Sequence, residues 1–133
     1  MNRQDIIKRH RKFVLDIVHV CDALPKSYSN GVFARQLIRA SSSVGANYRA
    51  AGRGKSTADF INKLKIVEEE ADECSYFLDL ILALNRSNTS EVQRLIKESE
   101  EILAMTVAAI KTARSNAASN TRTSNMVNRN SEQ

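Results

Sequence analysis

The stretch Arg35–Lys55, RQLIRASSSVGANYRAAGRGK, carries four arginines among small residues, and its periodicity indicates how the chain folds. At about 100° per residue, a helix would place these arginines within a sector of roughly 80°. They are Arg35, Arg39, Arg49 and Arg53. The opposite face would hold the apolar residues Phe33, Leu37, Ala40, Val44, Tyr48 and Ala51. Because such a helix buries its apolar face, the stretch predicts one helix of a bundle, spanning about residues 31–53.

Small residues form a third line on the same helix, beside the apolar face. Glycine within a helix costs about 1 kcal/mol relative to alanine, so Gly45 indicates a close approach of another backbone. That backbone could belong to the same chain or to a neighbouring copy. The residues that we assign to helix packing or to an interface are Ala34, Ser41, Gly45, Asn47 and Gly52.

Apolar residues recur at helical spacing in three further segments, about 5–24, 57–85 and 90–114. Capping residues precede each of the four helices. They are Asn2 or Asp5, Ser29 or Asn30, Ser56 with Asp59, and Ser90 with Gln93. Short loops between long helices make neighbours antiparallel. The chain is therefore predicted to be all-α, with residues 1–114 forming an up-down-up-down four-helix bundle.

The ends of the chain have a different composition. Residues 115–133 are rich in Asn, Ser and Thr and have little apolar surface to bury, so we expect a disordered tail. The charged start MNRQDIIKRHRK lacks the apolar stretch of a secretory signal, and no apolar run is long enough to cross a membrane. We expect a cytoplasmic protein without a membrane segment.

Charge is distributed unevenly along the chain. Residues 1–56 contain 11 Lys and Arg against 3 Asp and Glu, whereas residues 57–114 contain 7 against 11. The basic half could attract nucleic acid, or it could pair with the acidic half of a neighbouring copy.

The arginine ridge is the strongest candidate site. The planar, permanently charged guanidinium suits phosphate binding, and stacked like charges repel each other unless an anionic partner relieves them. Three interpretations remain open: a nucleic-acid surface, a site for an acidic protein, or a solvated face that binds nothing specific. The residues predicted to bind nucleic acid are Arg35, Arg39, Arg49, Arg53 and Lys55, widened by Lys8, Arg9, Arg11 and Lys12.

Sites for catalysis, metals or cofactors are not indicated. GRGKS ends like a phosphate-binding P-loop, but that motif needs a glycine where Arg49 stands. His10 and His19 lie on opposite sides of one helix and cannot share a metal, and His10 is predicted to pack in the core. The acidic run Glu68–Glu73 lacks the Glu-x-x-His partner of a di-metal bundle. We expect no enzyme activity, no cofactor and no metal.

Three segments carry a resemblance to a known family: the Ser-rich run ending in GAN at Asn47, KSTADFI at Lys55–Ile61, and EADECSYFLDL at Glu70–Leu80. They resemble the four-helix bundle proteins encoded within intervening sequences of bacterial 23S ribosomal RNA genes, also called S23 ribosomal proteins. The similarity extends over nearly all of residues 1–114. One departure is Ala50, because the family often has a glutamate shortly after the Asn47 position.

The resemblance implies an antiparallel bundle that assembles as a ring-shaped homopentamer. The accessory proteins of diversity-generating retroelements are similar in fold, bind nucleic acid through a basic surface and bind a reverse transcriptase. We therefore expect a homo-oligomer that associates with RNA or DNA. The alternative is a structural or protein-interaction scaffold, without a nucleic-acid role, in which the basic and acidic halves of neighbouring protomers pair.

Overall fold

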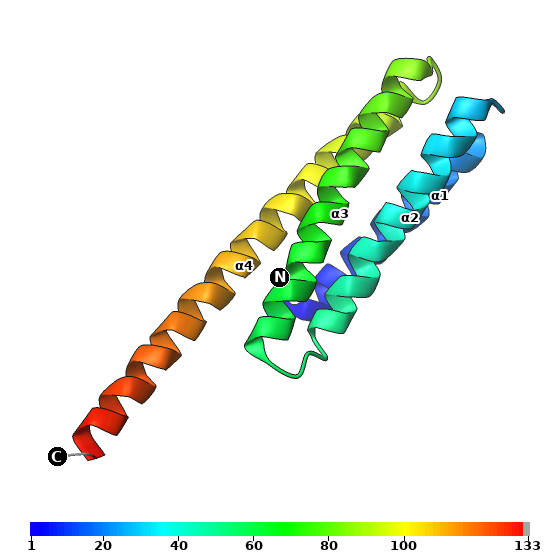
Figure 1. Cartoon of the computed structure of the whole chain (residues 1–133). Coiled ribbons are helices and arrows are strands. Elements are labelled where there is room, and N and C mark those ends of the chain that lie inside the picture. Colours follow the sequence, from blue (N-terminus) through cyan, green and yellow to red (C-terminus); the bar gives the residue numbers. More distant parts are fainter. Residues whose placement is uncertain (132–133) are drawn as a thin grey trace.

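The computed structural model describes residues 1–131 and the side chains of residues 1–126. The described residues form four helices joined by short loops (Figure 1). These are α1 (Arg3–Ala23), α2 (Tyr28–Ala51), α3 (Thr57–Leu84) and α4 (Thr89–Ser131). The predicted all-α bundle is confirmed.

Two of the helix starts follow the expected caps, and α2 does not. Asn2 caps α1 in a reciprocal box with Asp5, and the Ser56 hydroxyl of α3 accepts from the Asp59 amide. α2 begins earlier than predicted, because the Ser27 hydroxyl accepts the amide N–H of Asn30 at 3.1 Å. The Asn30 side chain is instead paired with Asn85 at the end of α3, where each amide donates to the other at 2.9 Å.

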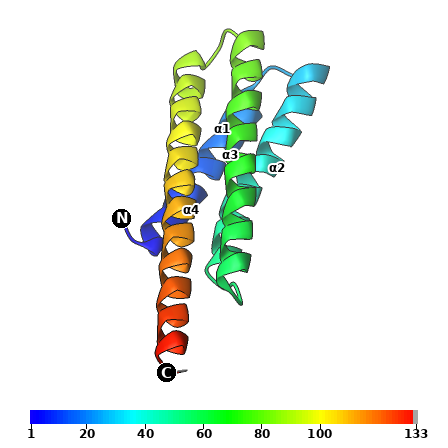
Figure 2. The same cartoon turned by 60° about the vertical axis from the view of Figure 1, so that its left-hand side comes forward.

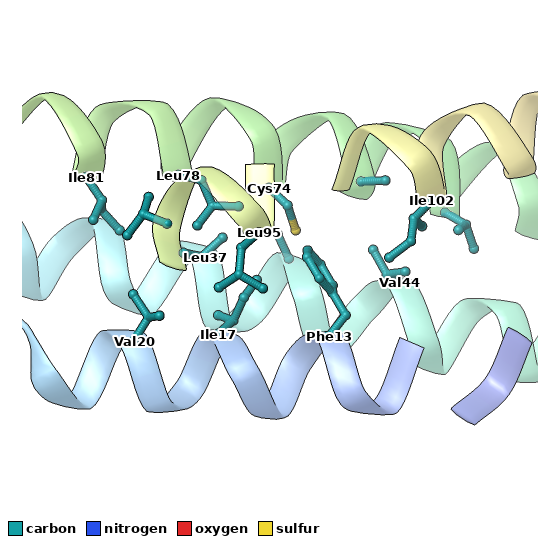
Figure 3. Packing of buried hydrophobic residues seen from close by; sticks show 14 residues of the cluster. Phe13, Ile17, Val20, Leu37, Val44, Cys74, Leu78, Ile81, Leu95 and Ile102 are labelled. Atoms are coloured by element: carbon teal, nitrogen blue, oxygen red, sulfur yellow. The ribbon is translucent and has the colours of Figure 1, made fainter. Parts of the chain in front are cut away.

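α1 and α3 each pack against α2 and α4, so that the four helices enclose one core. Figure 3 shows Ile17, Leu37, Leu78 and Leu95, one from each helix, pointing into the same interior. All four side chains are fully buried. Each comes from the apolar face of its helix, which is the face that the helical spacing of apolar residues predicted to be buried. No helix in the described part of the chain is both long enough and apolar enough to cross a membrane.

The segment after residue 114 differs from the expected disordered tail. α4 continues as a helix to Ser131 and extends past the turn between α2 and α3 (Figures 1 and 2). Every side chain from Ala118 to Met126 is exposed. The composition thus correctly indicated that nothing packs there, but lack of packing does not by itself prevent the helix of the bundle from continuing.

Gly45 lies where α1 approaches α2. A Cβ added to Gly45 would lie 3.5 Å from Cβ of His10, which is ordinary van der Waals contact. The helix that approaches closely is therefore α1 of the same chain. An alanine fits at this distance, so the expectation that glycine is sterically required there is wrong.

The other small residues of α2 also make contacts within the chain. Ser41 is fully buried and its hydroxyl donates to the Ile38 carbonyl at 3.2 Å. The Asn47 amide donates to the carbonyl and the hydroxyl of Ser43 at 2.9 and 2.8 Å. Ala34 is half-buried near the loop between α1 and α2. These small residues therefore contribute to helix packing within one chain, and their contacts do not require a second copy.

Gly45 allows a test of this packing. Replacing it with alanine removes the flexibility of glycine without a clash, so Gly45→Ala should raise the free energy of unfolding by up to about 1 kcal/mol. Gly45→Leu should lower it by about 1–3 kcal/mol, because the longer side chain overpacks against His10. Urea denaturation measures both. A destabilised Gly45→Ala would show that α1 and α2 lie closer together than this distance implies.

His10 is a core histidine, as the sequence predicted. It is only 2% exposed, and its ring meets that of Tyr48 edge-on with centroids 4.9 Å apart. Its Nδ1 is buried and has no hydrogen-bond partner among the described residues. Burial, with a smaller contribution from the charge of Arg9, lowers the pKa of His10 from 6.5 to about 4. The ring is therefore neutral in the folded protein at pH 7.

His10 should make the bundle sensitive to acid. Because its folded pKa lies below its unfolded pKa, its contribution to stability is present above pH 6.5 and is lost as the pH falls towards 4. The shift corresponds to a loss of roughly 3 kcal/mol at most. Urea denaturation at each pH should show this loss in the wild type and in the control His19→Gln, but not in His10→Leu. Equal pH profiles for all three would contradict it.

Candidate nucleic-acid interface

The predicted arginine ridge is exposed but not continuous. Arg35 and Arg39 lie in the first half of α2, Arg49 lies in its last turn, and all three are exposed. α2 ends at Ala51, two residues earlier than expected, so Arg53 lies in the turn that leads to α3. In this turn the amides of Arg53 and Gly54 donate to carbonyls three residues earlier, at 3.1 Å. Arg53 and Lys55 are exposed there.

Arg39 is bound to carboxylates of its own chain. Its guanidinium contacts Glu70 at 3.2 Å and Glu73 at 2.8 Å, both on α3. The hydrogen bonds that Arg39 donates to Glu73 and Glu70 raise the pKa of its guanidinium. Arg35 stands apart from the other arginines. Its guanidinium lies near Gly31. At a rise of 1.5 Å per residue, the backbone of Arg35 is about 20 Å along the helix from that of Arg49. The ridge is thus divided by a neutralised arginine.

Of the four α1 cations predicted to widen the ridge, two are likewise paired with carboxylates of the same chain. Arg9 is held between Glu98 and Glu101 of α4, and hydrogen bonding to Glu98 raises the pKa of the guanidinium. Lys12 pairs with Asp16 at 2.6 Å. Lys8 and Arg11 are exposed and form no ion pair with a described residue. Arg9 is therefore a link between α1 and α4, and does not widen a free basic surface.

Asp16 extends this link along α1 and α4. Besides Lys12, it accepts a hydrogen bond from Arg94 of α4 at 2.8 Å. Partial burial opposes ionisation, but the bonds from Lys12 and Arg94 outweigh it and lower the pKa of Asp16. The carboxylate therefore stays charged at neutral pH and holds the two helices together.

Arg3 lies at the end of the bundle where α2 meets α3, and the sequence prediction missed it. Its Nη2 donates to the carbonyl oxygen of Arg49 at 3.1 Å. Its guanidinium lies 6.0 Å from the centre of the Tyr48 ring. Gly52 leaves room for it, because a Cβ at that position would overlap the guanidinium. Gly52 therefore lets the exposed Arg3 side chain lie against the last turn of α2.

Together these residues form a cluster that we call the basic end, consisting of Arg3, Arg49, Arg53 and Lys55. None of the four forms an ion pair with a carboxylate of a described residue. Two carboxylates lie in the same region, Asp5 in the cap of α1 and Asp59 in the first turn of α3. The first turn of α3 also directs unpaired amide groups and the positive end of its dipole towards this region.

The geometry of the basic end suits phosphodiesters. Guanidinium groups donate two parallel hydrogen bonds to phosphate, and exposed cations keep their counterions until a polyanion displaces them. Because no deep pocket or aromatic platform lies among these residues, contacts with the backbone of a nucleic acid would dominate over contacts with its bases.

Other chemistry has little support in the described residues. No three His, Cys, Asp or Glu side chains among them converge as a metal site would require. The cavity beside His10 has a volume of about 40 Å³, which is far too small for an organic ligand. Burial raises the pKa of the Cys21 thiol to about 11 and that of Cys74 further, so neither is a ready nucleophile.

Comparison with known proteins agrees with the sequence motifs. Residues 2–108 match the model of the 23S rRNA-intervening sequence protein family. A crystal structure of a protein with unknown function from the S23 ribosomal protein family of Bacteroides thetaiotaomicron VPI-5482 is 31% identical, with a TM-score of 0.75. The match covers 84% of this chain and 99% of that one. No curated protein matches the chain.

The family resemblance expected from the sequence is thus confirmed by a match over most of the chain and by a shared fold. The chain belongs to the 23S rRNA-intervening sequence protein family.

Proposed function

We propose that this protein is a non-enzymatic, cytoplasmic homo-oligomer that associates with the backbone of RNA or DNA through the basic end. The observation that supports this most is the contrast between two sets of cations. Arg9 and Arg39 are held by carboxylates of the same chain, whereas Arg49, Arg53 and Lys55 are not. The unpaired set lies together at one end of the bundle.

Electrostatics explains why this end would attract a polyanion. The exposed side chains repel each other in the isolated protein, and phosphate groups would relieve that repulsion. Binding would depend on counterion release, and therefore on salt, with little dependence on base sequence. Arg35, Lys8 and Arg11 would add to the long-range field, but the contacts themselves would form at the basic end.

A test replaces the exposed cations of the basic end and measures salt dependence. The triple variant Arg49→Gln, Arg53→Gln and Lys55→Gln should bind a 20-base-pair duplex more weakly. The slope of log affinity against log salt concentration should also become less steep, by about 0.9 for each phosphate that the variant no longer neutralises. Fluorescence anisotropy at several salt concentrations gives both quantities.

The matched control removes three exposed cations elsewhere, with the substitutions Lys26→Gln, Arg86→Gln and Lys97→Gln. The control has the same net charge as the triple variant, so it should lose only the general electrostatic attraction. Identical salt slopes for the wild type and the triple variant would contradict binding at the basic end.

A scaffold without nucleic acid is the second candidate, and one surface favours it. Glu68, Glu69 and Asp72 lie on the outer side of α3, beside Lys65 and Leu103, and form no ion pair with a described residue. They could receive the basic end of a neighbouring copy, in a pentamer or another ring. In that case, raising the salt concentration would dissociate the oligomer, and the subunit would show no retention on heparin or RNA.

A further inference from the structure

The last part of α4, residues 115–131, forms what we call the C-terminal arm. The family match ends at residue 108, and the solved relative is matched over 99% of its own length by only 84% of this chain. The arm therefore lies beyond the part of the chain that the family model matches. Figures 1 and 2 show it as a single rod that extends past the turn between α2 and α3.

The composition of the arm does not favour a free helix. Asn, Ser and Thr make up 11 of its 17 residues, and these rank low in helix propensity. The hydroxyls of Thr121 and Thr123 donate to backbone carbonyls one turn earlier, at 3.0 and 3.1 Å, an interaction that slightly weakens helices. Residues 118–126 are all exposed. Such a helix gains most of its stability from a partner.

The charged residues in and beside the arm indicate whether that partner is anionic or cationic. No aspartate or glutamate stands between Glu101 and Glu132, although four lysines and arginines do. At about 100° per residue, Arg122 of the arm shares a sector of roughly 80° with Lys111 and Arg114, which directly precede the arm on α4. All three are exposed, and none is in an ion pair with a described residue. The rod thus presents a basic ridge to an anionic partner.

The shape of the arm favours one kind of nucleic acid. Proteins that bind single strands stack bases on aromatic side chains, and α4 contains no Phe, Tyr or Trp. A helix with its side chains is about 10–12 Å wide, which fits the major groove of B-form DNA at about 12 Å. The major groove of duplex RNA is too narrow to admit it. Asn and Arg are also the side chains that donate to adenine and guanine edges in that groove.

The arm leaves the bundle beside the basic end. Thr57 and Phe60, in the first turn of α3, line a shallow groove together with α4 residues from Ala109 to Asn120. The first turn of α3 directly follows Lys55 and Ser56. A duplex lying along the arm would therefore also place phosphates near Arg53 and Lys55.

We propose that the C-terminal arm docks as a helix in the major groove of duplex DNA, while the basic end contacts the flanking phosphates. This inference rests on the proposed association with nucleic acid and adds the identity of the partner. Docking would stabilise the helix of residues 115–126, as expected for a basic segment that orders on its target.

The experiment uses the full chain and three probes of one base sequence and one length: duplex DNA, duplex RNA and single-stranded DNA. Arg114→Gln with Arg122→Gln removes charge from the basic ridge that runs into the arm, with Arg86→Gln and Lys97→Gln as the matched control. Ala118→Pro breaks the helix without changing charge, and Ala118→Ser is its control. Fluorescence anisotropy measures affinity, and hydrogen exchange measures protection of the arm amides.

Both arm variants should lose about tenfold in affinity for duplex DNA relative to their controls, and their affinity for duplex RNA should equal that of the controls. Duplex DNA should also increase the protection of amides 115–126. Equal losses on all three probes, or an Ala118→Pro variant that binds like the wild type, would overturn groove docking and leave the proposed function intact. An arm variant with altered native mass and unaltered DNA affinity would assign the arm to a second copy, which also overturns it.

A wild-type protein that binds none of the three probes would overturn the proposed function together with this inference. The two failures are therefore distinguishable, because the first leaves binding by the basic end in place. Circular dichroism of each variant confirms that the bundle remains folded before the affinities are compared.

Discussion

The antiparallel packing of a basic half against an acidic half determines which cations of this bundle are available to a partner. Residues 1–56, which include α1 and α2, contain 11 Lys and Arg against 3 Asp and Glu, whereas residues 57–114 contain 7 against 11. Where the two halves meet, Arg9 is held by Glu98 and Glu101, and Arg39 by Glu70 and Glu73. These pairs link helices at a partly exposed surface, and they remove two cations from the set that a partner could neutralise.

The two ends of the bundle consequently differ in chemistry. At one end, Asn30 and Asn85 exchange amide hydrogen bonds, and Asn30 also donates to the Pro25 carbonyl at 2.9 Å. The asparagine pair at this end is neutral and its hydrogen bonds are satisfied, and the exposed cations Lys26 and Arg86 lie in the loops beside it. At the other end, Arg3 covers Gly52 and the last turn of α2, next to Arg53 and Lys55. A polyanion would be attracted to the second end, where the long α4 also emerges.

The fold could be predicted from the sequence because it follows from local rules. The apolar stripes and the caps at Asn2 and Ser56 fix the helices, and short loops fix their antiparallel order. The candidate site was predicted only in part, because ion pairs between helices depend on register, which periodicity does not give. That α2 and α3 place Arg39 opposite Glu70 and Glu73 could not be predicted from either helix alone.

Two further differences have a related physical origin. Arg3 was missed because an arginine at the start of a helix normally faces solvent, and its contact with α2 depends on the space above Gly52. The predicted antiparallel order did indicate this contact, because it brings the start of α1 to the end of α2. The helical arm was not predicted, because its composition alone does not favour a helix. In the structure the arm continues α4, and a helix that is already nucleated extends more easily than a new one forms.

The side-chain NMR signals of the arginines test most directly which arginines are held by carboxylates and which are free to bind phosphate. In a titration with duplex DNA, the Nε–Hε resonances of Arg3, Arg49 and Arg53 should shift, because these guanidinium groups are free to meet phosphate. Those of Arg9 and Arg39 should stay in place, because carboxylates of the same chain already hold them. Shifts of Arg9 and Arg39 as large as those at the basic end would contradict the account.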